Sequence, residues 1–346
     1  MAIPYRDSIN EKMNSYYNRN FHFFKQVNTI FMYAVDPGAF SVLSLFANLL
    51  QSKKHRLIFV LDGWARANES TRYPKALRMN REEFVQSQPE GKALLIYGAQ
   101  TLFSKNYRIV DQCRHKNVDT LLIFDHWKNC LINFRDPETG TLHLPSRVAV
   151  IDEYHRECLR KELSPFVAEY FFDSVDVFGQ PAISHSVEVI RSLSGASIAS
   201  LLKKFNPQKK SLALLILEPI RDDFGKDSFP GYDEFTISEF FFAFCCTNGM
   251  RVLIKPHPRH NPDHIRTFFA TKINSSDFDY TVVTDEKVEH LIAIADEIYG
   301  MTSIAMMAAL YAGKQITSLQ INRNRFGRTL SNPYLEPHTI TSSFSA

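Results

Sequence analysis

Short runs of consecutive apolar residues recur along the chain, and helical stretches separate them. A strand that is apolar on both sides, rather than alternating with polar residues, is typical of a sheet covered on both faces. Strands that alternate with helices indicate βαβ units and a parallel sheet. The first half of the chain therefore predicts an α/β fold with strands at Thr29–Val35, His55–Leu61, Ala93–Tyr97, Thr120–Phe124 and Val148–Ile151.

The same pattern starts again after the polar stretch Asn206–Lys210. A chain of 346 residues has room for about two domains of roughly 150 residues each. We therefore predict a Rossmann-like domain over residues 1–205, a linker at about 206–210 and a second Rossmann-like domain over residues 211–346. Two α/β halves with candidate sites on both suggest two sheets that face each other across a central cleft, and ligand pockets prefer such domain boundaries.

The remaining elements follow from the same alternation. In the second half we predict strands at Ser211–Leu217, Arg251–Ile254, Tyr280–Val283 and around Glu297–Tyr299. Helices are expected at Phe40–Ser52, Ser184–Phe205, Thr236–Asn248 and Asn261–Ala270, and from about Thr302 to Gly313.

Composition excludes several classes of protein. The net charge of +3 is too small to argue for a nucleic-acid partner. Five cysteines without a Cys-x-x-Cys pair argue against a disulfide framework and a zinc site, and they favour a reducing compartment. The N-terminus lacks the apolar core of a signal peptide, and no apolar run approaches the roughly 18 residues of a membrane span. We predict a soluble, cytoplasmic protein, with peripheral membrane contact left open.

The segment from Arg251 to His260 carries the strongest chemical signal. A proline on each side of His257 stiffens the backbone, so this imidazole stands on a rigid loop at a strand's C-terminal end. Ligands bind at that edge in open α/β sheets. Because Lys255 and Arg259 lie beside the imidazole, we predict an anionic ligand, most simply a phosphate. A purely structural His-Pro turn is the alternative.

A second candidate anion site follows the strand around Glu297–Tyr299. Gly300 leads into a helix that begins near Thr302 and Ser303 and is closed by Gly313. Hydroxyls and free backbone N–H groups at a helix N-terminus bind anions, and the helix dipole adds to the attraction. A plain N-cap would explain Ser303 by itself, but the two sites together favour a phosphate ligand.

In the first half, a carboxylate follows the strand His55–Leu61. Asp62 is placed at the edge of the sheet, and Gly63 allows the backbone to turn away sharply. This position suits Asp62 as a general base, although an Asp-Gly turn without chemistry is the alternative. Trp64 is expected either to contact a sugar or to pack.

Other polar residues follow strands as well. Asp125 and His126 come after an apolar strand and form a rival acid–base pair. The turn from Asp36 to Gly38 is expected to border the same cleft, whereas the adjacent acids Asp222 and Asp223 are expected to face solvent. The sequence has no Gly-x-Gly-x-x-Gly fingerprint, Walker loop or His-Glu-x-x-His motif, so we expect neither a dinucleotide cofactor nor a metal.

The arrangement of these residues resembles the bacterial sialyltransferases and polysialyltransferases of the GT-B fold. Those families carry an acidic-acidic-Gly motif in the N-terminal domain, and His-Pro and Ser-Ser/Thr motifs in the C-terminal domain. The matching segments occur here in the same order, as Leu61-Asp62-Gly63, His257-Pro258 and Thr302-Ser303. Two features depart from the pattern: a leucine takes the first acidic position, and the hydroxyl pair is reversed.

The resemblance implies an acceptor-binding N-terminal domain and a C-terminal domain that binds a CMP-sugar. It implies inverting transfer of sialic acid from CMP-sialic acid to a sugar hydroxyl of a glycan, such as a lipooligosaccharide or capsule, without a metal or cofactor. Asp62 would be the base, and His257 would stabilise or protonate the departing CMP phosphate. Donor contacts are expected from Lys255, Pro258, Arg259, Gly300, Thr302, Ser303 and Glu218, and acceptor contacts from Asp36, Gly38, Gly63, Trp64, Asp125 and His126.

Other functions share this layout. Kdo transferases and CDP-glycerol glycerophosphotransferases also resemble it, but the acidic residue that usually precedes the hydroxyl pair of the latter is missing, since Gly300 and Met301 precede Thr302. A UDP-sugar epimerase has two similar halves and a His-Pro segment, with more glycines and acids expected at the hydroxyl site. A non-enzymatic sugar- or nucleotide-binding protein would need neither Asp62 nor His257 for activity.

Overall fold

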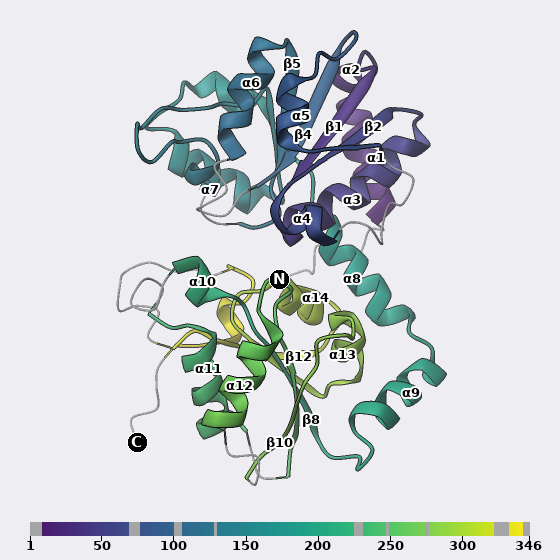
Figure 1. Ribbon diagram of the computed structural model, residues 1–346, viewed down its shortest axis with the longest axis vertical. Helices are drawn as coiled ribbons and strands as arrows, with labels where there is room; N and C mark the ends of the chain where they lie inside the picture. Colours follow the sequence, from purple (N-terminus) through teal and green to yellow (C-terminus); the bar gives the residue numbers. More distant parts are fainter. Residues whose placement is uncertain are drawn as a thin grey trace. The chain divides into compact units, whose positions relative to one another are not determined.

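A computed structural model describes residues 9–68, 77–99, 106–127, 130–224, 231–246, 249–273, 277–321 and 332–341. The chain divides into two compact units, and the division falls between Ala182 and Ile183. Each unit is an α/β domain built on a parallel sheet, as the sequence predicts (Figure 1).

The sheet of the N-terminal unit has the strand order β3-β2-β1-β4-β5-β6-β7, and neighbouring strands are parallel. The order reverses between β1 and β4, which is where ligands bind in folds of this kind. The strands are β1 (Thr29–Ala34), β2 (Arg56–Leu61), β3 (Leu77–Met79), β4 (Ala93–Gly98), β5 (Val118–Ile123), β6 (Arg147–Val150) and β7 (Val175–Val177).

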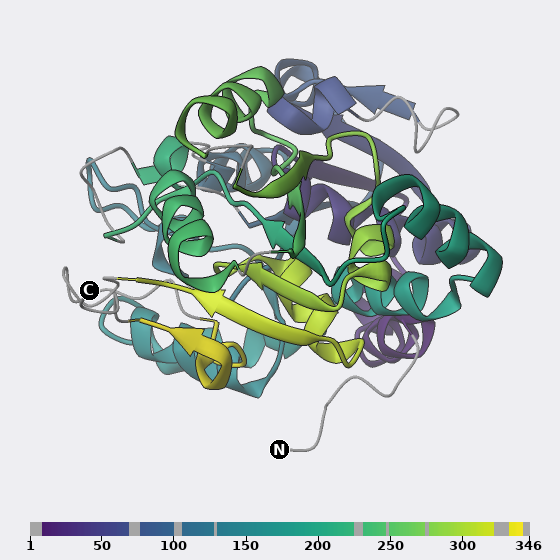
Figure 2. The same ribbon diagram turned by 90° about the horizontal axis from the view of Figure 1, so that it is seen from below.

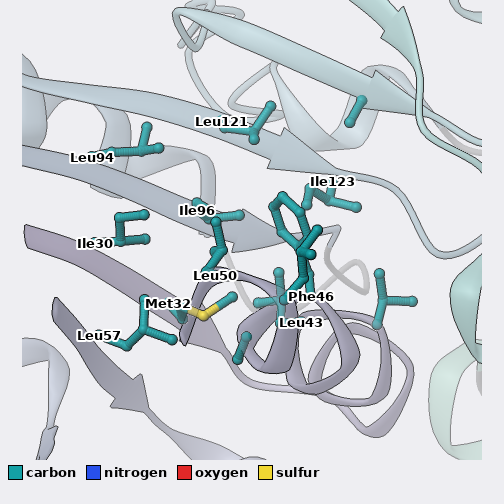
Figure 3. Close-up of a cluster of buried hydrophobic side chains, with 14 of the residues drawn as sticks. Ile30, Met32, Leu43, Phe46, Leu50, Leu57, Leu94, Ile96, Leu121 and Ile123 are labelled. Carbon is teal, nitrogen blue, oxygen red and sulfur yellow. The ribbon is translucent and has the colours of Figure 1, made fainter. Parts of the chain in front are cut away.

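Strand β1 shows why the sheet is covered on both faces. Ile30 and Met32 belong to one buried cluster, and Phe31 and Tyr33 to another, because successive side chains of a strand point to opposite faces. Figure 3 shows the first cluster, where Phe46 of α3 lies over the strands. The helices are α1 (Ile9–Arg19), α2 (Phe21–Phe24), α3 (Pro37–Ser52), α4 (Gly63–Asn68), α5 (Arg81–Gln86), α6 (Ile109–His115) and α7 (Glu153–Leu163).

The sheet of the C-terminal unit has the order β10-β9-β8-β11-β12-β13, again with parallel neighbours. This order also reverses once, between β8 and β11, and Figure 2 views these green-to-yellow strands from another side. The strands are β8 (Leu212–Ile216), β9 (Arg251–Lys255), β10 (Asp279–Val282), β11 (Glu297–Gly300), β12 (Gln315–Leu319) and β13 (Thr339–Ile340).

Helices cover this second sheet on both sides. Val252 and Ile254 of β9 pack in a cluster with Ile237 and Phe269, which come from α11 and α12. On the other side, α13 packs against β8, and α14 packs against β11 and β12. The helices are α8 (Pro181–Ser192), α9 (Gly195–Phe205), α10 (Ile220–Phe224), α11 (Glu234–Phe240), α12 (Pro262–Lys272), α13 (Val288–Ile294) and α14 (Ile304–Tyr311).

The boundary between the units differs from the one expected at 206–210. The side chain of Asn206 bonds both the N–H and the carbonyl of Lys210, so this segment is a closed turn within the C-terminal unit. The single helix predicted at Ser184–Phe205 is two helices, because Ser194 accepts the N–H of Ser197 and caps α9. Residues 183–205 therefore belong to the C-terminal unit.

Helix α3 begins earlier than the sequence pattern predicts. The expected turn from Asp36 to Gly38 is its first turn, with Asp36 at the N-cap position and Pro37 directly after it. Proline is favourable at the first helical position because its missing N–H has no partner there in any case. The helix expected at Thr236–Asn248 also differs, since α11 continues as a π-helical turn over Phe241–Cys245. Among the described residues, no helix combines the length and apolar content that a membrane span requires.

Candidate active site

The loops that follow β8, β9 and β11 lie side by side at the carboxyl edge of the C-terminal sheet. The three strands are neighbours in the order β9-β8-β11, and parallel strands bring their carboxyl ends to the same edge. Strand β9 leads into His257, β8 into Glu218, and β11 into Thr302 and Ser303. The structure thus brings together the donor-side residues that were predicted from the sequence.

His257 is held in a tight turn that ends at His260. The carbonyl of His257 accepts the N–H of His260 at 2.9 Å, and the N–H of His257 donates to Nδ1 of His260 at 3.0 Å. Nδ1 of His257 accepts the N–H of Arg259 at 3.2 Å, so the ring proton of His257 lies on Nε2. Burial, and then the nearby Arg259 and His260, lower the pKa of His257 to about 3. His257 is therefore a neutral imidazole whose Nε2–H is a hydrogen-bond donor.

Arg259 forms a bidentate ion pair with Asp223 of α10. Its two terminal nitrogens each lie 2.7 Å from one carboxylate oxygen, and the two side chains are only 25% and 19% exposed. The expectation that Asp223 faces solvent is wrong, because the loop that carries Arg259 lies against α10. The charge of Arg259 is balanced before any ligand arrives. Pro258, between Arg259 and His257, is exposed.

Lys255 also has partners within the protein. Its ammonium group donates to the carbonyls of Thr284 and Glu286 at 2.9 and 2.7 Å, in the connection between β10 and α13. Burial lowers the pKa of Lys255, and the carboxylates of Asp285, Glu286 and Glu289 act in the opposite direction. Lys255 therefore fixes this connection beside the His257 turn.

Glu218 occupies the backbone N–H groups that were expected to be free for an anion. One carboxylate oxygen accepts the N–H groups of Thr302 and Ser303 at 2.5 and 2.8 Å, and the other accepts the Thr302 hydroxyl at 2.8 Å. Ser303 is the N-cap of α14, which was the alternative to an anion site: its Oγ accepts the N–H of Ala305 at 3.2 Å, which leaves its hydroxyl hydrogen as a donor. The N-terminus of α14 thus binds an anionic group of the protein itself, the carboxylate of Glu218.

Burial raises the pKa of Glu218, and the hydrogen bonds from Thr302 and Ser303 oppose that change. Gly300 ends β11 in a crowded place, where an added Cβ would lie 2.8 Å from Sδ of Met306 and 3.1 Å from the carbonyl of Ile216. The missing side chain of Gly300 therefore allows β11 to pack closely against β8 and α14.

Asp62 follows β2 at the carboxyl edge of the N-terminal sheet and is half-buried. Its Oδ2 accepts a hydrogen bond from the hydroxyl of Tyr33 at 3.3 Å. Burial raises the pKa of Tyr33, so the phenol stays protonated and remains a donor. The next residue, Gly63, has a φ of +51°, a conformation that favours glycine, and it starts α4 directly after the carboxylate.

Trp64 packs against the core: its ring lies 6.4 Å from that of Phe40, in an edge-to-face arrangement. Of the two roles predicted for Trp64, this position supports packing. A sugar contact stays a prediction.

Asp125 and His126 form a hydrogen-bonded pair at the end of β5. Nδ1 of His126 lies 2.7 Å from Oδ1 of Asp125, and the amide of Gln180 donates to the Asp125 carbonyl at 2.6 Å. Oδ2 of Asp125 lies against the backbone of Gly38, where an added Cβ would be only 2.0 Å away. The segments that follow β1 and β5 therefore meet.

The two candidate bases lie apart on this edge. Strands β2 and β5 are separated by β1 and β4, and three strand spacings correspond to roughly 14 Å. Asp62 and His126 therefore belong to different parts of the edge and are alternatives for one proton transfer.

A polar cavity of about 180 Å³ adjoins the strand end that carries Asp62. Its lining residues come from β2, β3, α4 and the start of α5, and they are Leu61, Arg66, Arg78, Met79, Asn80 and Glu83. Two guanidinium groups in one cavity suit a polar or anionic ligand group.

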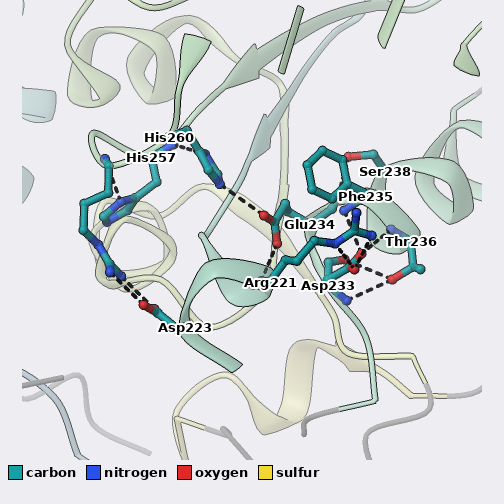
Figure 4. Close-up of polar contacts among 10 residues, drawn as sticks. Arg221, Asp223, Asp233, Glu234, Phe235, Thr236, Ser238, His257 and His260 are labelled. Carbon is teal, nitrogen blue, oxygen red and sulfur yellow. Dashed lines mark hydrogen bonds and ion pairs between the residues drawn. The ribbon is translucent and has the colours of Figure 1, made fainter. Parts of the chain in front are cut away.

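A polar network around the buried side chains of Asp233 and Glu234 lies beside the His257 turn, and it was not predicted from the sequence (Figure 4). Arg221 of α10 donates to Asp233 through Nε at 2.8 Å, and its backbone N–H donates to Glu234 at 3.0 Å. Asp233 caps α11 by accepting the N–H groups of Phe235 and Thr236. The capping pattern Asp-x-x-Thr before an apolar stretch was the available signal. Within the described parts of the chain, no group of three or more His, Cys, Asp or Glu side chains has the arrangement of a metal site.

A family model for alpha-2,8-polysialyltransferase (POLYST) matches residues 224–320 of this chain. The matched part is less than half of the chain, and it includes the His257 turn, Thr302 and Ser303. No curated protein matches the chain.

Solved structures resemble the chain over most of its length. A glycosyltransferase from Rickettsia africae matches with a TM-score of 0.56 and 10% identity, over 92% of this chain and 85% of that one. The wall teichoic acid polymerase TagF matches with a TM-score of 0.53 and 13% identity, over 96% and 81%. The UDP-GlcNAc 2-epimerase from Neisseria meningitidis, bound to UDP-GlcNAc, matches with a TM-score of 0.50 and 13% identity, over 84% and 82%.

These similarities establish the GT-B-like fold of two parallel-sheet α/β units. Because the identities are low and the enzymes differ, the fold by itself does not distinguish among their reactions. Together with the family match, it supports a glycosyltransferase.

Proposed function

We propose that this chain is an inverting glycosyltransferase that moves sialic acid from CMP-sialic acid to a sugar hydroxyl of a glycan. The observation that carries the proposal is the His257 turn, which lies within the residues matched by the polysialyltransferase model and presents a neutral Nε2–H donor at the carboxyl edge of the C-terminal sheet. That edge is where α/β folds bind nucleotides.

In the proposed reaction, Asp62 takes the proton from the acceptor hydroxyl. The hydroxyl oxygen then forms the new bond to the anomeric carbon, and the bond from that carbon to the phosphate oxygen breaks. CMP leaves with the electron pair. Because attack and departure occur on opposite faces of the carbon, the configuration inverts. The hydrogen bond from Tyr33 supports Asp62 by orienting its carboxylate.

His257 acts on the departing phosphate as a hydrogen-bond donor. Its Nδ1 is engaged by the N–H of Arg259 and its pKa is low, so the ring is neutral and does not transfer a proton in the ground state. A phosphate ester is a stable leaving group, and a preorganised donor is enough to stabilise its developing charge. The proposal therefore favours stabilisation of CMP over its protonation, and it includes no metal.

The hydroxyl of Ser303 supplies a second donor to the same phosphate. Glu218 keeps the turn before α14 in place by accepting hydrogen bonds from Thr302 and Ser303. The ion pair between Arg259 and Asp223 fixes the His257 turn to α10. In this proposal Glu218, Arg259 and Lys255 shape the donor site, although their bonds within the protein leave them no primary role in binding the phosphate.

The acceptor is proposed to bind at the N-terminal sheet edge, with the cavity near Arg66 and Arg78 as a polar surface that adjoins Asp62. Asp125 and His126 are the alternative base. None of the five cysteines forms a disulfide, which fits the proposed cytoplasmic location.

Turnover of the Asp62→Ala variant tests the proposal. We expect loss of sialyl transfer from CMP-sialic acid, with CMP affinity unchanged because Asp62 lies in the other unit. The matched control is His126→Asn, which removes the rival base and should leave transfer largely intact. Intact turnover in Asp62→Ala together with loss in His126→Asn would assign the base role to the Asp125–His126 pair.

The competing donors are tested with the same wild-type protein. TagF with CDPG and the epimerase with UDP-GlcNAc share the fold, so CDP-glycerol and UDP-GlcNAc are informative alternatives. CMP-Kdo is a third, because Kdo transferases share the motif layout. Transfer or epimerisation with one of these, and none with CMP-sialic acid, would replace the proposed substrate.

A further inference from the structure

We propose that Glu234 and His260 are positioning residues for His257. In this proposal the buried carboxylate of Glu234 keeps His260 in the tautomer whose Nδ1 accepts the backbone N–H of His257. The inference rests on the proposed function for the role of His257 itself. It adds two side chains that lie outside the His-Pro and hydroxyl motifs.

Glu234 and His260 are buried together although they come from different elements. Their side chains are 2% and 4% exposed, and Nε2 of His260 lies 3.5 Å from Oε1 of Glu234. This is a long, mainly electrostatic contact, and Figure 4 shows the imidazole pointing toward the carboxylate. The other carboxylate oxygen accepts the backbone N–H of Arg221 at 3.0 Å. Because a buried carboxylate is costly without donors, this arrangement favours a proton on Nε2 of His260.

The tautomer of His260 decides whether the turn can close. Nδ1 of His260 accepts the N–H of His257 at 3.0 Å, which requires an unprotonated Nδ1. A proton on Nδ1 would set two N–H groups against each other and break this bond. A carboxylate beside Nε2 selects the Nε2–H form, in the way that outer partners fix the tautomers of functional histidines. Glu234 thus selects the form that the turn needs.

The closed turn also holds the imidazole ring of His257 in its orientation. The N–H of Arg259, which sets the tautomer of His257, belongs to the same four residues that His260 closes. Opening the turn moves the Nε2–H donor relative to the phosphate. A displacement of about 1 Å costs roughly 100-fold in rate when a group must be aligned with a reacting centre. Neither Glu234 nor His260 needs to touch the substrate for this effect.

Two substitutions of His260 separate its two nitrogens. Asparagine places its amide oxygen near the position of Nδ1 and retains the acceptor for His257, whereas glutamine reaches toward Nε2 and lacks that acceptor. We expect His260→Asn to keep most of the turnover number and His260→Gln to lose roughly 100-fold in kcat, with little change in KM for CMP-sialic acid. Equal losses in both variants would indicate a packing role and overturn the proposal.

The role of Glu234 is tested by Glu234→Gln. Arg221 and His260 face different carboxylate oxygens, so an amide that keeps its oxygen toward Arg221 turns its NH2 group toward Nε2 of His260, and part of His260 should change to the Nδ1–H form. The ring ¹⁵N signals of His260, read by NMR in the full-length protein, report this change directly. Ser238→Ala is the control, because it removes a buried bond to the Glu234 carbonyl without touching the carboxylate.

The outcomes are distinguishable. A change of tautomer and a loss of kcat in Glu234→Gln, but not in Ser238→Ala, support the proposal. An unchanged His260 signal in Glu234→Gln overturns it. If wild type shows the predicted ring signals but transfers no sialic acid, the proposed function fails, whereas the selection of the His260 tautomer by Glu234 stands.

Discussion

Glu218 and Thr302 are joined by two hydrogen bonds: Oε1 of Glu218 accepts the Thr302 N–H at 2.5 Å, and Oε2 accepts the Thr302 hydroxyl at 2.8 Å. The same carboxylate accepts the N–H of Ser303. A side chain at the end of β8 is thereby tied to the start of α14, across the point where the strand order of the sheet reverses. The helix end that a phosphate would otherwise use is held in place by the protein.

Replacing Glu218 should therefore cost more stability than replacing its partner hydroxyl. Glu218→Ala leaves two backbone N–H groups without their acceptor, and each orphaned buried donor costs about 1–3 kcal/mol. Thr302→Val removes one hydroxyl bond and should cost about 0.5–1.5 kcal/mol. Urea unfolding of both variants measures the difference. Equal costs would mean that the N–H bonds to Glu218 contribute little.

The Arg259–Asp223 pair should be energetically coupled. Its geometry is bidentate and both side chains are mostly buried, so we expect a coupling energy of about 1–3 kcal/mol. The measurement is a double-mutant cycle of Asp223→Asn, Arg259→Gln and the double variant by chemical denaturation. Additivity within about 0.5 kcal/mol would show that the pair is not coupled.

His257 should make stability depend on pH. The unfolded residue binds a proton below about pH 6.5, whereas the folded one stays neutral down to about pH 3. Between these values the unfolded state binds more protons, so this contribution is complete above pH 6.5 and is lost as the pH falls through the window. Within this window, the titration of His257 lowers the free energy of unfolding by at most about 1.4 kcal/mol for each pH unit.

His257→Asn tests this dependence, because the amide oxygen can accept the N–H of Arg259 but does not titrate. Unfolding free energies at several pH values between about 6.5 and 4 should fall less steeply in the variant than in wild type. Parallel curves would contradict a neutral, buried His257.

The cavity near Asp62 should contribute to acceptor binding. Arg66→Gln removes a guanidinium group from its lining, and a lost charged hydrogen bond of about 1.4 kcal/mol corresponds to a tenfold rise in the KM of the acceptor. The KM of the donor should stay the same. Lys161→Gln on α7 is the control, since it makes the same change of charge at an exposed position away from the cavity. Equal effects of both substitutions would point to a general charge effect.

The sequence predicts the strands well where burial on both faces makes them continuously apolar. β1, β2, β4 and β8 fall where the apolar runs do. Short or alternating strands such as β3, with the sequence Leu-Arg-Met, carry too few apolar residues to be recognised. The break before α9 depends on one capping serine inside a helical pattern, which periodicity alone does not reveal.

In the candidate site, too, local features could be predicted from the sequence and long-range contacts could not. The turn around His257 is predictable because two prolines and a strand end are local features. The bond between Glu218 and Thr302 spans 84 residues, and that between Arg259 and Asp223 spans 36. Such partners depend on which loops the sheet order brings together. A free helix N-terminus was therefore expected where the fold supplies a carboxylate.

Measuring which nucleotide the protein binds tests the central claim most directly. Thermal unfolding is followed with CMP, CDP and UDP at millimolar concentration, without added metal. A ligand that binds only the native state stabilises it by about 2.7 kcal/mol at 100 times its dissociation constant. We expect a clear rise in Tm with CMP and a smaller one, or none, with UDP. Stabilisation by UDP without any response to CMP would contradict a CMP-sugar transferase.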